Sequence, residues 1–304
     1  MPDVLRGLDE YVPMRPQPDG TYFSYCVADG LSRVLPRRFS YWLALRAADQ
    51  FFARDAVGRA GVIANLRRIA EFKGEHLSDA EVMTMARWTF RNFGKHVADF
   101  FRFRRLSRAG LGRILTVDHP ERLQEAADLG RGVMALTAHF GSWELGAVIL
   151  ATRGYKVNVV VLPQRDGRID ALFQRRREER GSRVVPLGRA ARHVLEALKR
   201  REFVALLGDQ DYTAQDNFAT FFGAPARLPG GPARLCVRTG APIVPGFVVR
   251  RPDDTFEAHI HPPIVPARGT VESDVQARIC AALEQEIAAA PSQWFIFREF
   301  WTKT

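Results

Sequence analysis

A short apolar run that ends in a histidine constrains the fold of this chain more than any other stretch. Val133 to Ala138 is almost uninterrupted in its apolar character, which is typical of a strand buried on both faces of a sheet. His139 follows it directly, and Gly141 and Ser142 then supply turn and N-cap chemistry. Helix formers occupy Trp143 to Thr152, so we expect a helix there. The pattern predicts that His139 lies at the carboxyl end of a core strand, where the ligand sites of open α/β sheets gather.

The spacing of five residues between His139 and Glu144 indicates a chemical partnership. A neutral imidazole can take a proton from a hydroxyl group when its other ring nitrogen donates to a fixed acceptor. A tight strand-to-helix turn brings the Glu144 carboxylate back toward His139. We therefore predict that Glu144 fixes the tautomer and stabilises the imidazolium, as the acid of a catalytic triad does. The alternative interpretation is structural: His139 only packs at the end of the strand, and Glu144 only interacts favourably with the dipole at the helix N-terminus.

The strand and helix patterns divide the chain into a helical first part and an alternating second part. Short apolar strand patterns alternate with helix patterns in the second part, which predicts a mixed, mainly parallel sheet flanked by helices. The expected strands are 114–117, 133–138, 156–162, 183–186 and 203–207, followed by a hairpin of 243–250 and 255–260 and a last helix at 271–290. We expect one α/β domain over 1–304, with an N-terminal arm at 1–21, a helical part at 22–105 and an α/β catalytic core at 110–304.

The helical part carries two further signals. Ser78 and Glu81 form a capping box that opens a long helix. That helix is rich in aromatic residues between Trp88 and Phe103, which indicates core packing or, alternatively, the wall of an acyl-chain groove or a membrane-facing surface. In the second case, the arginines that follow are expected to reach lipid phosphates: Arg102, Arg104, Arg105 and Arg108.

Charge and cysteine usage limit the partners and the compartment. The formal net charge of +10 indicates an anionic partner: membrane lipid, an acidic carrier or nucleic acid. No aromatic RNA-binding strand motif occurs, so we expect no nucleic acid. Cys26, Cys236 and Cys280 lack metal-type spacing, so we expect three free thiols in a reducing cytosol, with the last two in the core. The N-terminus has no secretory pattern, and no stretch approaches the roughly 20 apolar residues of a membrane span.

Five ordered blocks give the chain a family resemblance. They are His139-Phe-Gly-Ser-Trp-Glu144, Leu207-Gly-Asp-Gln-Asp211, Phe221-Phe-Gly-Ala-Pro-Ala226, Thr239-Gly-Ala-Pro-Ile-Val-Pro245 and Pro291-Ser-Gln-Trp294. The first resembles the His-x4-Asp/Glu signature of the lysophospholipid acyltransferase superfamily. The set resembles more specifically the lipid A late acyltransferases, which transfer lauroyl and myristoyl chains, and their phosphatidylinositol mannoside relatives. The resemblance extends from about residue 30 to the C-terminus and implies a fold like that of the glycerolipid acyltransferases.

The resemblance implies an O-acyltransferase that needs no cofactor and no metal. It would move a fatty acyl chain from a thioester of acyl carrier protein or coenzyme A to a hydroxyl of a membrane lipid or glycolipid, with a lipid A-like acceptor favoured, as in lipopolysaccharide synthesis. Many relatives have an N-terminal transmembrane anchor that we do not expect here, so the implied location is peripheral, at the cytoplasmic face of the bacterial inner membrane. The alternatives are an esterase or thioesterase that uses water and a non-catalytic, basic lipid-binding protein.

The resemblance also assigns residues to the site. His139 is the expected general base, with Glu144 as its partner, and Gly141 and Trp143 belong to the same motif and are expected to contact substrate. The remaining expected substrate contacts are Asp209 and Gln210, which follow the strand 203–207, Arg177, four residues before Gly181, and Arg165. Relatives often show Tyr-Arg-Pro where this chain has Leu162-Pro163-Gln164-Arg165. Either Arg165 substitutes from a shifted position, or the acceptor headgroup differs.

Overall fold

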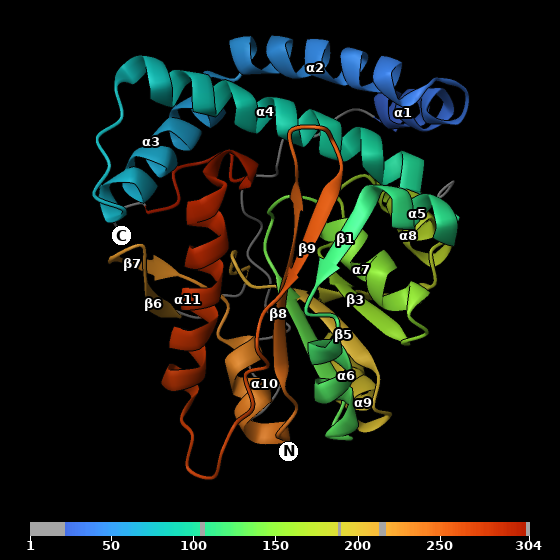
Figure 1. The fold of residues 1–304 in the computed structure, drawn as a ribbon, viewed down its shortest axis with the longest axis vertical. Coiled ribbons are helices and arrows are strands. Elements are labelled where there is room, and N and C mark those ends of the chain that lie inside the picture. The colour runs from blue at the N-terminus through green and yellow to red at the C-terminus, as the bar shows by residue number, and fades with distance from the viewer. Residues whose placement is uncertain (1–21, 104–106, 188–189, 213–216, 302–304) are drawn as a thin grey trace.

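The computed structural model describes residues 22–103, 107–187, 190–212 and 217–301, and the expected arm at 1–21 lies outside them (Figure 1). The first part is helical, as predicted. Its helices are α1 (Tyr22–Val34), α2 (Arg37–Arg54), α3 (Ala56–Phe72), α4 (Asp79–Arg102) and the short α5 (Arg108–Ile114). The predicted capping box opens α4, with the Ser78 side chain accepting from the Glu81 backbone and the Glu81 carboxylate accepting from the Ser78 backbone.

The second part forms the expected α/β architecture around a sheet of seven strands. In spatial order they are β1 (Leu115–Asp118), β9 (Phe256–Ile260), β8 (Ile243–Arg250), β2 (Val133–Thr137), β5 (Phe203–Leu207), β3 (Val157–Val161) and β4 (Ser182–Pro186). The five strands from β8 to β4 run parallel, β9 pairs antiparallel with β8 as the predicted hairpin, and β1 runs parallel to β9. A separate antiparallel pair, β6 (Phe218–Phe221) and β7 (Ala224–Arg227), was not predicted.

Helices cover both faces of the sheet, and the alternating side chains of β2 show which helices pack on each face. Met134 and Leu136 join the core that contains residues of α9 (Ala190–Lys199), α10 (Gly231–Thr239) and α11 (Glu272–Ala289). Val133 points the other way and packs with Leu123 of α6 (Glu121–Asp128) and Leu150 of α7 (Trp143–Thr152). Because successive side chains of a strand point to opposite faces, a continuously apolar strand such as β2 belongs between two helical layers.

The helices of the first part lie across one end of this sheet, at the top of Figure 1. Of the aromatic residues of α4, Phe90, Phe100 and Phe101 are buried, and Phe93 and Phe100 line a cavity. The guanidinium of Arg102, one of the arginines expected to reach lipid phosphates under the alternative to core packing, donates to the Leu35 carbonyl at 2.8 Å. Arg104 and Arg105 lie outside the described residues, as does the side chain of Arg108.

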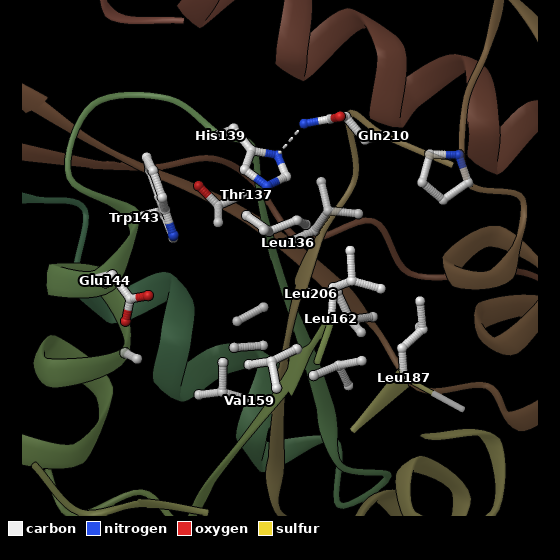
Figure 2. Close-up of a pocket in the computed structure, with 18 of the residues that line it drawn as sticks. Leu136, Thr137, His139, Trp143, Glu144, Val159, Leu162, Leu187, Leu206 and Gln210 are labelled. Atoms are coloured by element: carbon white, nitrogen blue, oxygen red, sulfur yellow. Dashed lines mark hydrogen bonds between the residues drawn. The ribbon is translucent and has the colours of Figure 1, made fainter. Parts of the chain in front are cut away.

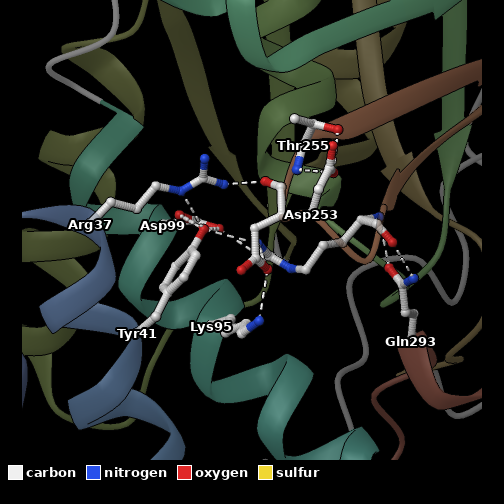
Figure 3. Close-up of polar contacts among 9 residues, drawn as sticks. Arg37, Tyr41, Lys95, Asp99, Asp253, Thr255 and Gln293 are labelled. Carbon is white, nitrogen blue, oxygen red and sulfur yellow. Dashed lines mark hydrogen bonds and ion pairs between the residues drawn. The ribbon is translucent and has the colours of Figure 1, made fainter.

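A buried polar network fastens these helices to the β8–β9 hairpin (Figure 3). The guanidinium of Arg250, the last residue of β8, forms an ion pair with Asp99 of α4 and donates to the Tyr41 hydroxyl of α2 at 2.9 Å. Tyr41 in turn donates to Asp99 at 2.8 Å. At the turn of the hairpin, Lys95 pairs with Asp254 at 2.7 Å. Burial makes these contacts costly to break, because a lost partner leaves a charge away from water.

Candidate active site

The register of two neighbouring parallel strands brings His139 and Asp209 together. Thr137, the last residue of β2, pairs with Leu207, the last residue of β5. His139 and Asp209 each follow by two residues, so they leave the same rim of the sheet side by side. The His139 Nδ1 atom lies 2.9 Å from the Asp209 Oδ1 atom. The predicted position of both residues, beyond the carboxyl ends of core strands, is confirmed.

Asp209 is held by hydrogen bonds from three directions and is completely buried. Its second oxygen, Oδ2, accepts from the His139 backbone N–H and from the Trp294 indole N–H, each at 2.9 Å. Burial acts to raise the pKa of Asp209, but the interaction with His139 and these hydrogen bonds outweigh it, so the pKa lies below its ordinary value. Asp209 is therefore a carboxylate at neutral pH. Asp209, expected to contact substrate, contacts His139 and does not line the cavity in this structure.

Glu144 has a different partner from the one that the spacing predicts. The Arg177 guanidinium of α8 (Gly167–Glu178) holds the Glu144 carboxylate through Nη2 at 2.7 Å and Nε at 3.1 Å. Burial would raise the pKa of Glu144, and the charge of Arg177 outweighs this effect and lowers it. The predicted hydrogen bond between Glu144 and the His139 ring is wrong, because the first turn of α7 presents Glu144 to α8 while Nδ1 of His139 faces Asp209.

The turn between His139 and α7 requires glycine. Gly141 has a φ of +57°, and a side chain there would place its Cβ atom 2.0 Å from the Val248 carbonyl oxygen of β8. Ser142 occupies the predicted N-cap position, and its backbone N–H donates to that same carbonyl at 2.7 Å, but its side chain forms no capping hydrogen bond. Gly141, expected to contact substrate, therefore shapes the turn and does not line the cavity in this structure.

His96 of α4 is a further residue of the site that the sequence did not indicate. It is buried, and its ring stacks on Trp143 with the ring centroids 3.7 Å apart. Burial lowers the pKa of His96 to about 3, so the imidazole is neutral at working pH. The one sign in the sequence that His96 belongs to the site was its position on a helix rich in aromatic residues. Many buried histidines without a functional role occupy such positions. The stacking partner of His96, Trp143, lines the cavity, as expected for a residue of the motif.

A cavity of about 380 Å³ opens beside the proposed base, a volume within the usual range for small-molecule sites. Figure 2 shows His139 and Gln210 at one end, with apolar side chains below them and the second nitrogen of the His139 ring directed toward these. Polar residues that line the cavity include His139, Glu144, Arg165, Arg177 and Gln210, and His96 lines it as well. Its apolar wall includes Leu136, Val159, Leu162, Leu187 and Leu206, with Phe93, Phe100 and Phe173 from α4 and α8.

Gln210 lies against the imidazole as well as the cavity. Its amide nitrogen is 3.1 Å from His139 Nδ1, the same atom that meets Asp209. An amide nitrogen donates and does not accept, so it does not compete for a proton at Nδ1, and the buried Asp209 carboxylate is the acceptor of that proton. Asp209 therefore orients the ring, with Nδ1 as the donor and the other nitrogen free to accept a proton.

Comparisons with known proteins agree with this architecture. A family model described as bacterial lipid A biosynthesis acyltransferase matches residues 20–303. The phosphatidylinositol mannoside acyltransferase of Mycolicibacterium smegmatis is 26% identical over 272 residues, which cover 86% of this chain and 88% of that protein. The Mycobacterium tuberculosis protein of the same description is 26% identical over 86% of each chain. The lipid A biosynthesis palmitoleoyltransferase of Escherichia coli is 27% identical over 62% of this chain and 61% of its own.

Proposed function

Because the chain belongs to the bacterial lipid A biosynthesis acyltransferase family, we propose that it transfers a fatty acyl chain from an acyl thioester to a hydroxyl group of a membrane glycolipid. The observation that carries the proposal is the oriented His139–Asp209 pair at one end of an apolar cavity. A long acyl chain fits such a wall, because each buried methylene contributes about 0.8 kcal/mol. The pair supplies a base where the thioester carbonyl would lie.

In the proposed reaction, the unprotonated nitrogen of His139 takes the proton of the acceptor hydroxyl as its oxygen attacks the thioester carbonyl carbon. The carbon–sulfur bond of the resulting tetrahedral intermediate then breaks, and the imidazolium returns the proton to the departing thiolate. Asp209 stabilises the imidazolium between the two steps, since it is a buried carboxylate in contact with Nδ1. No serine nucleophile is needed, because the hydroxyl of the acceptor attacks directly.

The Glu144–Arg177 pair forms the polar wall of the cavity in this proposal. The catalytic role that we assign to Glu144 is indirect: it holds the Arg177 fork beside the place where the thioester or the acceptor headgroup lies. A planar, permanently charged guanidinium suits an oxyanion or phosphate. Trp143, Gln210 and Arg165 remain proposed substrate contacts because all three line the cavity.

Replacing Arg177 by lysine is expected to lower turnover about tenfold or more while the protein still folds. Lysine keeps the positive charge but cannot hold the Glu144 carboxylate through two nitrogens, and hydrogen bonds to charged groups contribute about 1.5–3 kcal/mol. Arg175→Lys is the matched control, because Arg175 lies on the same helix and is exposed. Single-turnover transfer and thermal melting check both variants. Equal behaviour of the two would show that Arg177 has no special role.

A transfer assay tests the function itself. Purified protein is incubated with an acyl thioester, first alone and then with a total bacterial lipid extract, and the lipids are analysed by mass spectrometry. We expect an acylated lipid that forms only when thioester and extract are both present. Release of free fatty acid without a lipid product would instead identify an esterase or thioesterase. Acyl carrier protein and coenzyme A thioesters, compared at equal concentration, identify the donor.

The acceptor that we favour is a lipid A-like or other glycolipid at the cytoplasmic face of a bacterial inner membrane. Among the helices that the structure describes, none is long and apolar enough to cross a bilayer. A peripheral contact is supported by an apolar stripe on the outer face of α1 and α2. We define the α1–α2 stripe as Phe23, Val27, Leu31, Val34, Phe39 and Trp42, which are all exposed, with Phe23 and Val34 at 75% and 76%. The exposed Arg38 and Arg46 flank it.

The α1–α2 stripe predicts salt-sensitive binding to anionic vesicles. The apolar side chains would enter the headgroup layer, and the arginines would meet lipid phosphates, an attraction that salt screens over about 8 Å at physiological ionic strength. Phe23→Ser/Val34→Ser is expected to weaken sedimentation with such vesicles about tenfold, because two apolar side chains no longer leave water. Val57→Ser/Val271→Ser is the control, since both valines are exposed outside the stripe. Equal loss in the two double variants would contradict this membrane face.

A further inference from the structure

The segment that follows α11 runs beside the loop that carries His139. The backbone N–H of Phe295 donates to the His139 carbonyl at 2.8 Å, and the N–H of Gly141 donates to the Gln293 carbonyl at 2.9 Å. Phe140 and Trp294 thereby form an isolated antiparallel bridge. The loop at the end of β2 is thus paired with residues that lie more than 150 positions further along the chain. This pairing places the Trp294 side chain next to Asp209.

Trp294 reaches Asp209 through its indole N–H. The Nε1 atom lies 2.9 Å from Oδ2, the carboxylate oxygen that does not face the His139 ring. The ring is buried and packs edge-on against Phe300, with the centroids 5.1 Å apart. A tryptophan in an aromatic cluster needs no acceptor for its packing, but a buried N–H needs one. Here that acceptor is the carboxylate that orients the proposed base.

We propose that Trp294 is a positioning residue for acyl transfer: its indole N–H holds the Asp209 carboxylate so that Oδ1 meets Nδ1 of His139. This inference rests on the proposed function, in which His139 is the base. Trp294 touches neither the reacting atoms nor the cavity. The Trp294 side chain therefore acts through Asp209, so its loss should change only the protonation and orientation of the Asp209 carboxylate and, through it, of the His139 ring.

Gln293 fixes the segment from the other side. Its amide oxygen accepts from the Arg250 backbone N–H at 2.9 Å, and its amide nitrogen donates to the Arg250 carbonyl at 2.8 Å. Figure 3 shows this pair of hydrogen bonds beside the network that joins Arg250 to Asp99 and Tyr41. The position of Trp294 is therefore set by the last residue of β8, which is itself fastened to α2 and α4.

The chemistry of a buried carboxylate explains why the indole matters. Asp209 is fully buried, so each donor that it meets replaces part of the lost solvation and keeps it ionised. Without the Trp294 N–H, Oδ2 keeps only the His139 backbone N–H among the donors described here. The pKa of Asp209 then rises and the carboxylate gains freedom to rotate. Both changes weaken its hold on the imidazole.

The test is Trp294→Phe, which keeps an aromatic ring and removes the donor. We expect kcat to fall about tenfold, the scale of one hydrogen bond to a charged group, with KM nearly unchanged. The acid limb of the pH–rate profile is expected to move to higher pH, because Asp209 protonates more easily. Trp301→Phe is the matched control: Trp301 belongs to the same aromatic cluster, but its indole donates to the Phe221 carbonyl at 3.1 Å. Its acid limb should stay in place.

A double-mutant cycle separates positioning from packing. In an Asp209→Asn background, Trp294→Phe should cause no further loss of turnover, because the residue through which it acts has already been changed. A loss that persists in this background would overturn the inference. So would an acid limb that stays in place while Trp294→Phe and Trp301→Phe lower the melting temperature alike. Those results would leave the proposed function standing, whereas a transfer assay that gives no acylated lipid from thioester and extract would remove it.

Discussion

His139→Ala protein is expected to fold and to lose at least a hundredfold of its acyl transfer, since a positioned general base contributes about 10²- to 10⁴-fold. The imidazole is the one group that we assign to proton transfer, and its nitrogen opposite Asp209 faces the cavity (Figure 2). Alanine leaves Asp209 with the Trp294 indole and the backbone N–H of residue 139 as donors, so the buried charge keeps partners.

Single-turnover transfer and thermal melting, measured on the same preparation, check this prediction. His193→Ala serves as the control, because His193 is exposed on α9 and lies outside the cavity lining. A purely structural His139 would give a lowered melting temperature, with the folded fraction still active. A folded His139→Ala protein with full transfer activity would end the mechanism proposed here.

Asp209→Asn is expected to lower turnover almost as much as His139→Ala, since the aspartate of a catalytic triad contributes up to about 10⁴-fold. An amide cannot stabilise the imidazolium and can hold the ring in the wrong tautomer. Since Asp209 and His139 act as one unit, the double variant His139→Ala/Asp209→Asn should be little worse than His139→Ala alone. Transfer rates of the three variants give this coupling directly.

Glu144→Gln is the informative comparison for Asp209→Asn. Glu144 binds Arg177 and not the His139 ring, so we expect its loss to resemble that of Arg177→Lys and to add to the loss from Asp209→Asn. The opposite result is also defined. If Glu144→Gln caused no further loss of turnover in the His139→Ala protein, while Asp209→Asn did, then Glu144 would be the partner of His139 during turnover, as the His-x4-Glu spacing predicts.

Local patterns determined much of this protein. The apolar run of 133–138, the Gly141–Ser142 turn and the helix formers that follow produce β2, the turn and α7 within one residue of the predicted bounds. These are short-range features, because burial on two faces, a positive φ and helix propensity each depend on the types of residues that are adjacent in the sequence. For the same reason the sequence indicated that His139 and Asp209 each follow a core strand at the same rim of the sheet.

Only the tertiary structure decided which carboxylate meets His139. Two acidic residues were available, and the five-residue spacing favoured Glu144, but the β2–β5 register aligns Asp209 with the ring while Arg177 of α8 draws Glu144 away. Trp294 reaches the site through a bridge to a distant segment. The direction of a side chain at a strand or helix end depends on which neighbour packs beside it, and that neighbour can lie anywhere in the sequence. Spacing along the chain therefore predicted where His139 lies, and packing determined which carboxylate is the partner of this proposed base.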